Sequence, residues 1–368
     1  MNNRARFNFF LFISTFARAL IEVFISLLLF KNGFSIDSIL LFYLLENLVA
    51  LFISYFFVKI GERFNYSIVM QIGVASFAVL QFVLNNMAYN SLFIVIVALL
   101  YSLYRRGYWV ARRYYVTEVM PKRDSSGPFS IMMVVSEIAS ILAGFLGASL
   151  LDGFNVTILT VISSSLLFVS IIPLLGIESK TKRTKIELIK NLKKYDKKNY
   201  LAFSLYEINN VLAFIFPIFI AIYIKDTYVM AGAVNAIGSL AIIVFILVYG
   251  KIIKKRNYFV LSSILFVLIC FVKLLPLDYF ILVICFLEGF IKKMQEQSVN
   301  KIYFENRNNM DLTHYNLIYQ LLETLARAIV VVPLIFMKDM RLMIVFVLIV
   351  ISIELIIYAC LKKNQRLK

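Results

Sequence analysis

The sequence is poor in the charged and reactive side chains on which soluble enzymes depend. Only 16% of its 368 residues are charged, while 61% are hydrophobic; soluble domains have a charged share of about 25%. The chain has three cysteines, and all lie in apolar stretches without the paired spacing of a disulfide or metal site: Cys270, Cys285 and Cys360. We therefore expect neither a soluble globular core nor a bound metal.

Sequence motifs of nucleotide and hydrolase chemistry are also missing. The chain contains no P-loop, no zinc-type histidine motif and no nucleophile elbow. The single histidine, His314, precedes an apolar stretch, and we expect it to be solvated. The sequence predicts no catalytic residues, no enzymatic activity and no cofactor.

Long apolar runs recur along the whole chain, and its mean hydropathy is +0.86. A hydrocarbon core of ~30 Å needs ~20 helical residues per crossing. The first run is of full span length and lacks a small-residue cleavage site, so we expect it to remain in the mature protein. We predict an all-α polytopic membrane protein with twelve transmembrane helices near Phe7–Phe30, Ser38–Val58, Ser67–Leu84, Ser91–Ala111, Ser130–Leu151, Thr157–Gly176, Tyr200–Ile224, Ala231–Tyr249, Val260–Leu275, Tyr279–Val299, Leu317–Met337 and Leu342–Leu361.

The distribution of basic residues supports this helix count. With both termini in the cytoplasm, 27 of the 38 Lys and Arg fall in cytoplasmic segments and five in outer loops, as the positive-inside rule requires. The net charge of +17 is then explained by loops that face anionic lipid, and we expect no nucleic-acid partner. The six remaining cations lie at membrane depth: Arg18, Arg105, Arg106, Lys292, Lys293 and Arg327.

One connection is long and strongly basic. The segment 178–199 contains nine Lys and Arg, typical of a cytoplasmic linker. We therefore divide the chain into a six-helix bundle over 1–177, this linker, and a second six-helix bundle over 200–368.

The two halves contain matching features. The basic turn 59–66 recurs at 251–258, Arg105-Arg106 recurs as Lys292-Lys293, and Glu137 recurs as Glu323. The offsets are 192, 187 and 186 residues, a slow drift that loop deletions produce. Six helices per half in one orientation predict a parallel repeat about an axis along the membrane normal.

Two local motifs resemble those of the major facilitator superfamily. Glu62-Arg63-Phe64-Asn65 looks like the end of that family's loop between helices two and three. The stretch 139–148 is similar to its glycine-proline stretch in helix five, with Ala143-Gly144 in place of Gly-Pro. The resemblance implies a secondary transporter of two six-helix bundles, with helices one, four, seven and ten around a central cavity.

Charges inside a bilayer are costly and usually face a partner or a water-filled cavity. At 100° per residue, one stripe of the fourth span contains Tyr101, Arg105, Tyr108 and Arg112, with Trp109 alongside. The repeat places a mixed stripe on the tenth span. We predict that the following residues contact an anionic or zwitterionic substrate: Arg105, Arg106, Tyr101, Tyr108, Trp109, Glu288, Lys292, Lys293 and Gln295.

A second interpretation stays open, in which these cations form ion pairs that close a gate. The residues assigned to gating or ion pairs are Arg18, Arg112, Glu137, Glu296, Glu323 and Arg327. The spacing of Arg18 to Glu22, and of Glu323 to Arg327, is i to i+4 and predicts pairs within one helix. A third interpretation places Arg106 or Lys293 among lipid headgroups.

Three glutamates are candidates for proton coupling. Glu46 and Glu207 have no evident local partner, so burial favours their neutral, protonatable form. Glu22 is the third candidate, in the first span. For Glu354, in the last span, the sequence offers no role.

Together these patterns predict a monomeric, proton-linked carrier in the cytoplasmic membrane. Its partners are the lipid bilayer and a small or lipid-like substrate, which alternating access would carry across. Two alternatives remain: efflux of hydrophobic cations by proton antiport, and a non-transporting sensor or assembly factor on a carrier scaffold.

Overall fold

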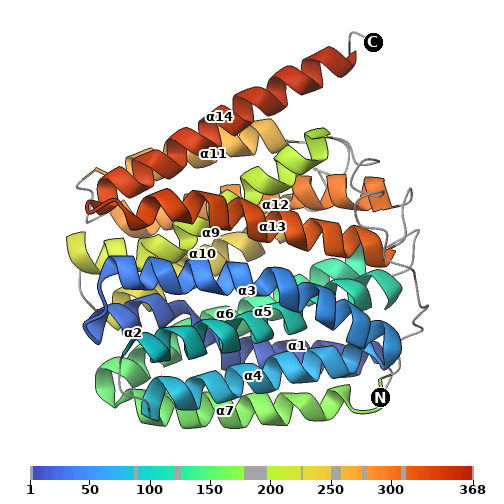
Figure 1. The fold of residues 1–368 in the computed structure, drawn as a ribbon, viewed down its shortest axis with the longest axis vertical. Coiled ribbons are helices and arrows are strands. Elements are labelled where there is room, and N and C mark those ends of the chain that lie inside the picture. The colour runs from blue at the N-terminus through green and yellow to red at the C-terminus, as the bar shows by residue number, and fades with distance from the viewer. Residues whose placement is uncertain are drawn as a thin grey trace.

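The computed structural model describes residues 3–86, 90–119, 126–177, 197–224, 227–249, 258–275, 280–307 and 312–366. Within these ranges the chain is built of helices and contains no strand (Figure 1). The helices are α1 (Asn3–Ala19), η1 (Glu22–Phe24), α2 (Ile25–Lys31), α3 (Ile36–Arg63), α4 (Tyr66–Asn86), α5 (Ser91–Val119), α6 (Ser126–Gly153), α7 (Val156–Ile171), η2 (Ile172–Leu174), α9 (Lys197–Tyr223), α10 (Tyr228–Tyr249), α11 (Phe259–Val272), α12 (Ile281–Arg307), α13 (Leu312–Ile335) and α14 (Met340–Arg366).

These helices confirm the predicted polytopic fold. Ten segments of the described chain are long and apolar enough to cross a membrane, and the first of them combines α1, η1 and α2. The other two predicted spans correspond to α11, which has 14 residues, and to α12, which contains several charges. Linker residues 178–196 lie outside the described chain.

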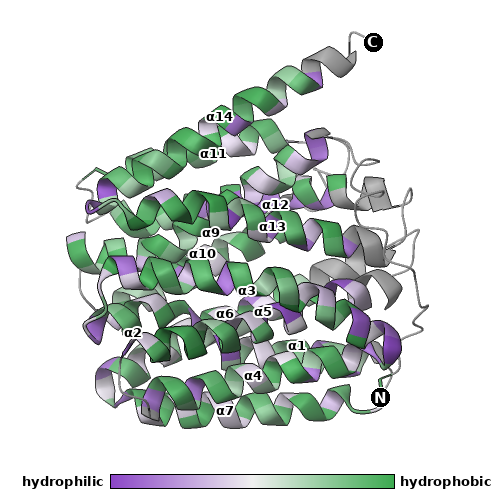
Figure 2. Cartoon of the chain, in the orientation of Figure 1, coloured by the Kyte–Doolittle hydropathy of each residue, from purple (hydrophilic) through white to green (hydrophobic). Residues whose placement is uncertain are grey.

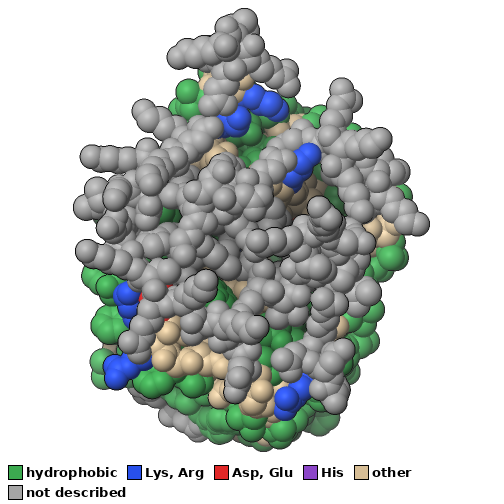
Figure 3. Space-filling model, turned by 90° about the vertical axis from the view of Figure 1, so that its right-hand side faces the viewer, with side chains coloured by type: hydrophobic (Ala, Val, Ile, Leu, Met, Phe, Trp, Pro, Cys, Tyr) green, Lys and Arg blue, Asp and Glu red, His purple; other side chains and the backbone are tan. Residues whose placement is uncertain are grey.

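The helices run side by side, so their ends define two faces of the bundle (Figure 1). The chain starts and finishes at the same face, as an even number of crossings requires. Hydrophobic residues cover the sides of the bundle, and hydrophilic residues gather at its ends and in its interior (Figure 2). On the face with the termini, the described charged side chains are mainly Lys and Arg (Figure 3).

Packing divides the helices into two groups that meet along two seams. In the first half α1 contacts α6 and α7, α4 contacts α5 and α7, and α3 contacts α5. In the second half α9 contacts α13 and α14, α10 contacts α12, and α11 contacts α12 and α14. Between the halves, α3 packs on α13 and α6 packs on α10.

The first span is not one continuous helix, which corrects the prediction of a single helix over 7–30. The helix stops at Ala19, and the backbone at Ile21 has φ −128° before the η1 turn begins. The Ser163 hydroxyl donates a hydrogen bond of 2.5 Å to the Ala17 carbonyl near the break. A side chain at Gly147 would collide with the Leu20 carbonyl, so only glycine lets α6 approach this closely.

The α6–α10 seam also depends on a glycine. A Cβ atom at Gly232 would lie 2.5 Å from the Gly144 carbonyl oxygen and 2.7 Å from the Ala148 Cβ. Both of those atoms belong to α6, so the backbones of the two halves are in direct contact here.

Candidate functional site

A cavity of about 570 Å³ lies at the meeting of the two halves. This volume is in the range of small-molecule sites. Residues from α1, η1, α2, α3, α5 and α6 form its first side, and residues from α9, α10, α12 and α13 form the second. Its charged lining residues are Arg18, Arg105, Arg112, Arg113, Arg327, Glu22, Glu137, Glu207, Glu296 and Glu323.

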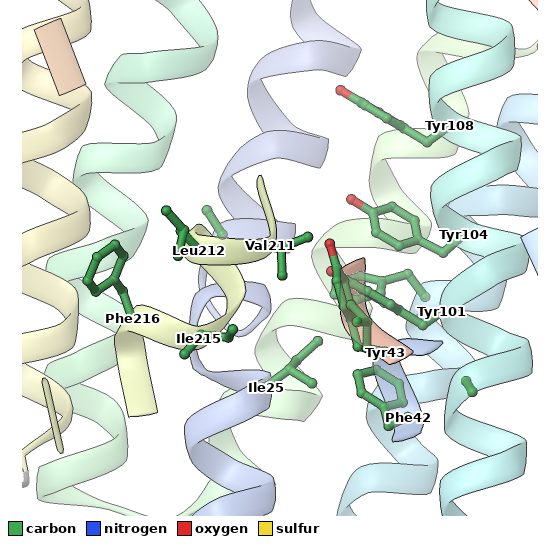
Figure 4. Packing of buried hydrophobic residues seen from close by; sticks show 14 of the residues in the cluster. Ile25, Phe42, Tyr43, Tyr101, Tyr104, Tyr108, Val211, Leu212, Ile215 and Phe216 are labelled. Atoms are coloured by element: carbon green, nitrogen blue, oxygen red, sulfur yellow. The ribbon is translucent and has the colours of Figure 1, made fainter. Parts of the chain in front are cut away.

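A row of tyrosines extends along α5 beside this cavity. Figure 4 shows Tyr101, Tyr104 and Tyr108 projecting from α5 in the same direction, one helical turn apart. Tyr104 and Tyr108 are buried, and Tyr101 together with Trp109 lines the cavity. The residues of the stripe predicted on the fourth span therefore lie on one side of α5, and only part of that side lines the cavity.

Arg18 on α1 binds to this tyrosine row. Its Nη1 donates a hydrogen bond of 3.1 Å to the Tyr104 hydroxyl, and its guanidinium carbon lies 5.2 Å from the centre of the Tyr108 ring. Its Nε lies 3.2 Å from Glu22, so the predicted i, i+4 pair is present. The Tyr101 hydroxyl donates to the other oxygen of Glu22 at 3.0 Å. Glu22 is the first residue of η1 and so lies directly after the break of the first span.

Glu46 has a partner, contrary to the interpretation from the sequence. The Nη1 of Arg105 lies 3.0 Å from the Glu46 carboxylate, which is 0% exposed. The pair joins α3 to α5, and sequence spacing reveals only pairs within one helix. Arg105 also lines the cavity, whereas Glu46 lies behind it.

The carboxylate of Glu323 on α13 interacts with arginines from both halves of the molecule. Arg113 on α5 donates to it at 2.9 Å, Arg327 on α13 donates at 2.7 Å, and Arg106 on α5 lies 3.7 Å away. Arg327 also pairs with Glu207 on α9, which corrects the expectation that Glu207 has no partner. This network joins α5 of the first half to α9 and α13 of the second.

The repeat predicted from the sequence makes Glu137 the counterpart of Glu323 and Lys293 the counterpart of Arg106. Glu137 and Glu323 each lie 11 residues after their helices begin, at Ser126 and Leu312. Arg106 on α5 pairs with Glu323 across the halves, whereas no ion pair within 4.0 Å joins the described residues Lys293 and Glu137. Lys293 also bonds Glu296 on its own helix at 2.9 Å. Arg106 and Lys293 therefore each lie near a glutamate, Glu323 and Glu296 respectively, and neither lines the cavity.

The remaining residues of the predicted stripe on the tenth span lie away from the cavity lining. Glu288 pairs with Lys273 at the end of α11. Gln295 is fully buried and bonds Asn209 and Ser263, at 2.6 and 2.8 Å. Lys292 is partly buried outside the lining. Among the charged site residues predicted on α12, only Glu296 lines the cavity, because the polar face of α12 is turned toward α9 and α11.

Arg112 differs from the other arginines of the cavity. It is 9% exposed and lines the cavity, and no carboxylate of the described residues lies within 4.0 Å of it. Its guanidinium lies 4.8 Å from the centre of the Trp109 ring, and its Nη2 contacts the Met133 sulfur at 3.7 Å. Its contacts among the described residues are therefore with aromatic rings and a thioether sulfur.

Aromatic residues of the two halves meet at the cavity lining, toward the end of the bundle where α3 begins. The rings of Tyr43 on α3 and Phe214 on α9 stack with their centres 4.1 Å apart. Nearer the chain turns at that end, Lys31 lies 4.4 Å from the centre of the Tyr228 ring. Figure 4 shows Tyr43 facing the segment of α9 that includes Val211 and Ile215.

The comparison with known families agrees with this architecture. The family model described as the Major Facilitator Superfamily matches residues 7–353. The chain belongs to the major facilitator superfamily. No curated protein matches the chain significantly. As a member of the major facilitator superfamily, the protein is a multi-pass membrane protein of the secondary-transporter type and handles small-molecule substrates.

One charged cavity residue was missed because the predicted fourth span of this superfamily member ended too early. Arg113 was assigned to a cytoplasmic loop beyond Ala111, whereas α5 continues to Val119. Its guanidinium packs 4.2 Å from the centre of the Tyr319 ring on α13. The aromatic run around it was the only signal in the sequence that this helix extends further.

Proposed function

We propose that this transporter moves a small amphiphilic anion or zwitterion by alternating access. The supporting observation is Arg112, a cavity-lining guanidinium with no carboxylate partner among the described residues. A guanidinium binds carboxylate or phosphate groups through two parallel hydrogen bonds. A substrate anion would supply the acceptor that the described residues do not provide at this position.

The rest of the cavity suits an amphiphilic molecule. Its walls include the aromatic side chains of Tyr43, Tyr101, Trp109, Tyr206, Phe214 and Tyr319. Glu137 also lines the cavity, without an ion pair within 4.0 Å among the described residues, and could accept the amine of a zwitterion. We further propose a monomer with both termini in the cytoplasm, and halves over 1–177 and 200–368 joined by a linker at 178–199.

Replacing Arg112 with alanine should reduce counterflow of the anionic substrate at least tenfold. The loss of one charge-assisted hydrogen bond to a substrate costs about 1.5–3 kcal/mol, and 1.4 kcal/mol corresponds to a factor of ten. The measurement is counterflow in proteoliposomes against a panel of carboxylates, phosphates, zwitterions and hydrophobic cations.

Arg112→Lys is the matched control, because it keeps the charge and loses the planar fork. It should retain more transport than Arg112→Ala. If both variants transport every anion normally while Glu137→Gln loses transport of hydrophobic cations, the protein is a cation carrier instead.

For proton coupling we propose Glu22, which lines the cavity beside the break of the first span. Its partners, Arg18 and Tyr101, come from α1 and α5, so a change in cavity shape would change both of these contacts. Glu22→Gln should abolish uphill transport driven by a pH gradient and preserve counterflow, which needs no net proton movement. Equal loss of both activities would instead assign Glu22 to substrate binding or folding.

A further inference from the structure

The interface between α5 and α13 contains a buried arginine whose donors the described residues do not satisfy. Arg106 is 1% exposed, and its Nε and Nη2 have no acceptor within the described chain. Its ion pair with Glu323 spans 3.7 Å, which is longer than a hydrogen bond. Glu323 already accepts hydrogen bonds from Arg113 and Arg327. Among the described residues, Arg106 therefore has no acceptor that forms a hydrogen bond with its buried charge.

The side of α13 that faces Arg106 contains further buried polar groups without hydrogen-bond partners among the described residues. Gln320, Glu323 and Arg327 follow one another at i, i+3 and i+7, so they share one face of the helix. Arg327 is 3% exposed, and its Nε and Nη1 have no acceptor among the described residues. Gln320 is 0% exposed, and both of its amide atoms lack a partner there. The ion pair between Glu323 and Arg106 brings this face of α13 close to α5.

Buried donors without acceptors destabilise the fold unless another group supplies the missing acceptors. Buried polar groups are nearly always hydrogen-bonded, and a buried charge without its partner destabilises a protein by several kcal/mol. An arginine has donors only, so the missing group must be an acceptor. Water would supply lone pairs but no negative charge, whereas an anion supplies lone pairs and a compensating negative charge.

We propose that a small monovalent inorganic anion of chloride's size and charge binds between α5 and α13, held by Arg106, Arg327 and Gln320. Arg327 lines the cavity and gives the ion a route in, while Arg106 lies behind the lining and out of reach of an organic substrate. The neighbouring Glu46 is paired with Arg105 at 3.0 Å, which limits its repulsion. Because Arg106 belongs to the first half and Arg327 to the second, the ion would favour the state in which they are close.

The test is thermal unfolding of the purified full chain in chloride, bromide or gluconate at constant ionic strength. Chloride and bromide should raise the Tm by about 2–4 °C in a saturable manner, and gluconate should not. Arg106→Gln should lose this rise. Arg112→Gln, which removes a cavity arginine outside the proposed ion site, should keep it, even if substrate transport fails.

A second measurement covers the case in which Arg106→Gln does not fold. Crystals of the unaltered protein grown in bromide should give an anomalous peak between Arg106 and Arg327. Halide-independent unfolding of the unaltered protein would mean that water satisfies these groups, and the proposal would be wrong. A rise that persists in Arg106→Gln, or bromide found only beside Arg112, would also overturn it.

Discussion

Glu323→Gln is expected to lower the free energy of unfolding by about 3–5 kcal/mol and to abolish transport. The substitution removes the carboxylate shared by Arg106, Arg113 and Arg327, at 3.7, 2.9 and 2.7 Å. Those arginines would remain buried with less compensating charge, and the contact from α5 to α13 would be lost. The change is measured by the thermal unfolding of purified protein and by counterflow in proteoliposomes.

Lys59→Gln is the matched control for this prediction. Lys59 pairs with Glu62 at 3.3 Å on α3, and its side chain is 40% exposed. Exposed pairs contribute about 0–1 kcal/mol, so the variant should unfold and transport nearly as the unaltered protein does. If Glu323→Gln were no more damaging than Lys59→Gln, the Glu323 network would not join the halves.

Gly232→Ala is expected to reduce transport at least tenfold by pushing the two halves apart. The new methyl group would meet the Gly144 carbonyl oxygen at 2.5 Å and the Ala148 Cβ at 2.7 Å, both on α6. Overpacking of this kind costs about 1–3 kcal/mol, and 1.4 kcal/mol changes an equilibrium tenfold. The penalty applies to the state in which α6 and α10 touch, so counterflow should slow while the variant remains folded.

The same helix provides the control for this substitution. A Cβ atom at Gly238 would have no atom within 4 Å, apart from its own helix backbone and chain neighbours. Gly238→Ala should therefore transport normally. Equal effects of the two substitutions would point to helix propensity as the cause, not to contact between the halves.

Features that depend on sequence period and composition were predictable. Twelve spans followed from apolar length and from the sidedness of Lys and Arg, whereas the repeat that matches Arg105-Arg106 with Lys292-Lys293 stays a prediction. The i, i+4 pair of Arg18 and Glu22 was also visible, because helix geometry alone brings these side chains together.

Features that depend on helix packing were not predictable. Glu46 meets Arg105 from another helix 59 residues away, and Glu207 meets Arg327 over 120 residues. The predicted role of Lys292 and Gln295 at the cavity assumed that the repeat preserves helix rotation, whereas α12 presents Glu296 to the cavity. The break after Ala19 depends on Ser163 and Gly147, which lie on α7 and α6. The hydrogen bond from Ser204 on α9 to Glu354 on α14 is likewise a contact between distant segments.

The charges of α12 have a consequence for how the chain is assembled during synthesis. Lys292, Lys293 and Glu296 lie within a helix that is not apolar enough to enter lipid unaided. Their burial depends on α10 and α11, which precede α12 in the chain and pack directly on it. We therefore expect those two helices to stay near the insertion site until α12 emerges, so that α12 inserts by docking onto earlier helices and not by partitioning independently.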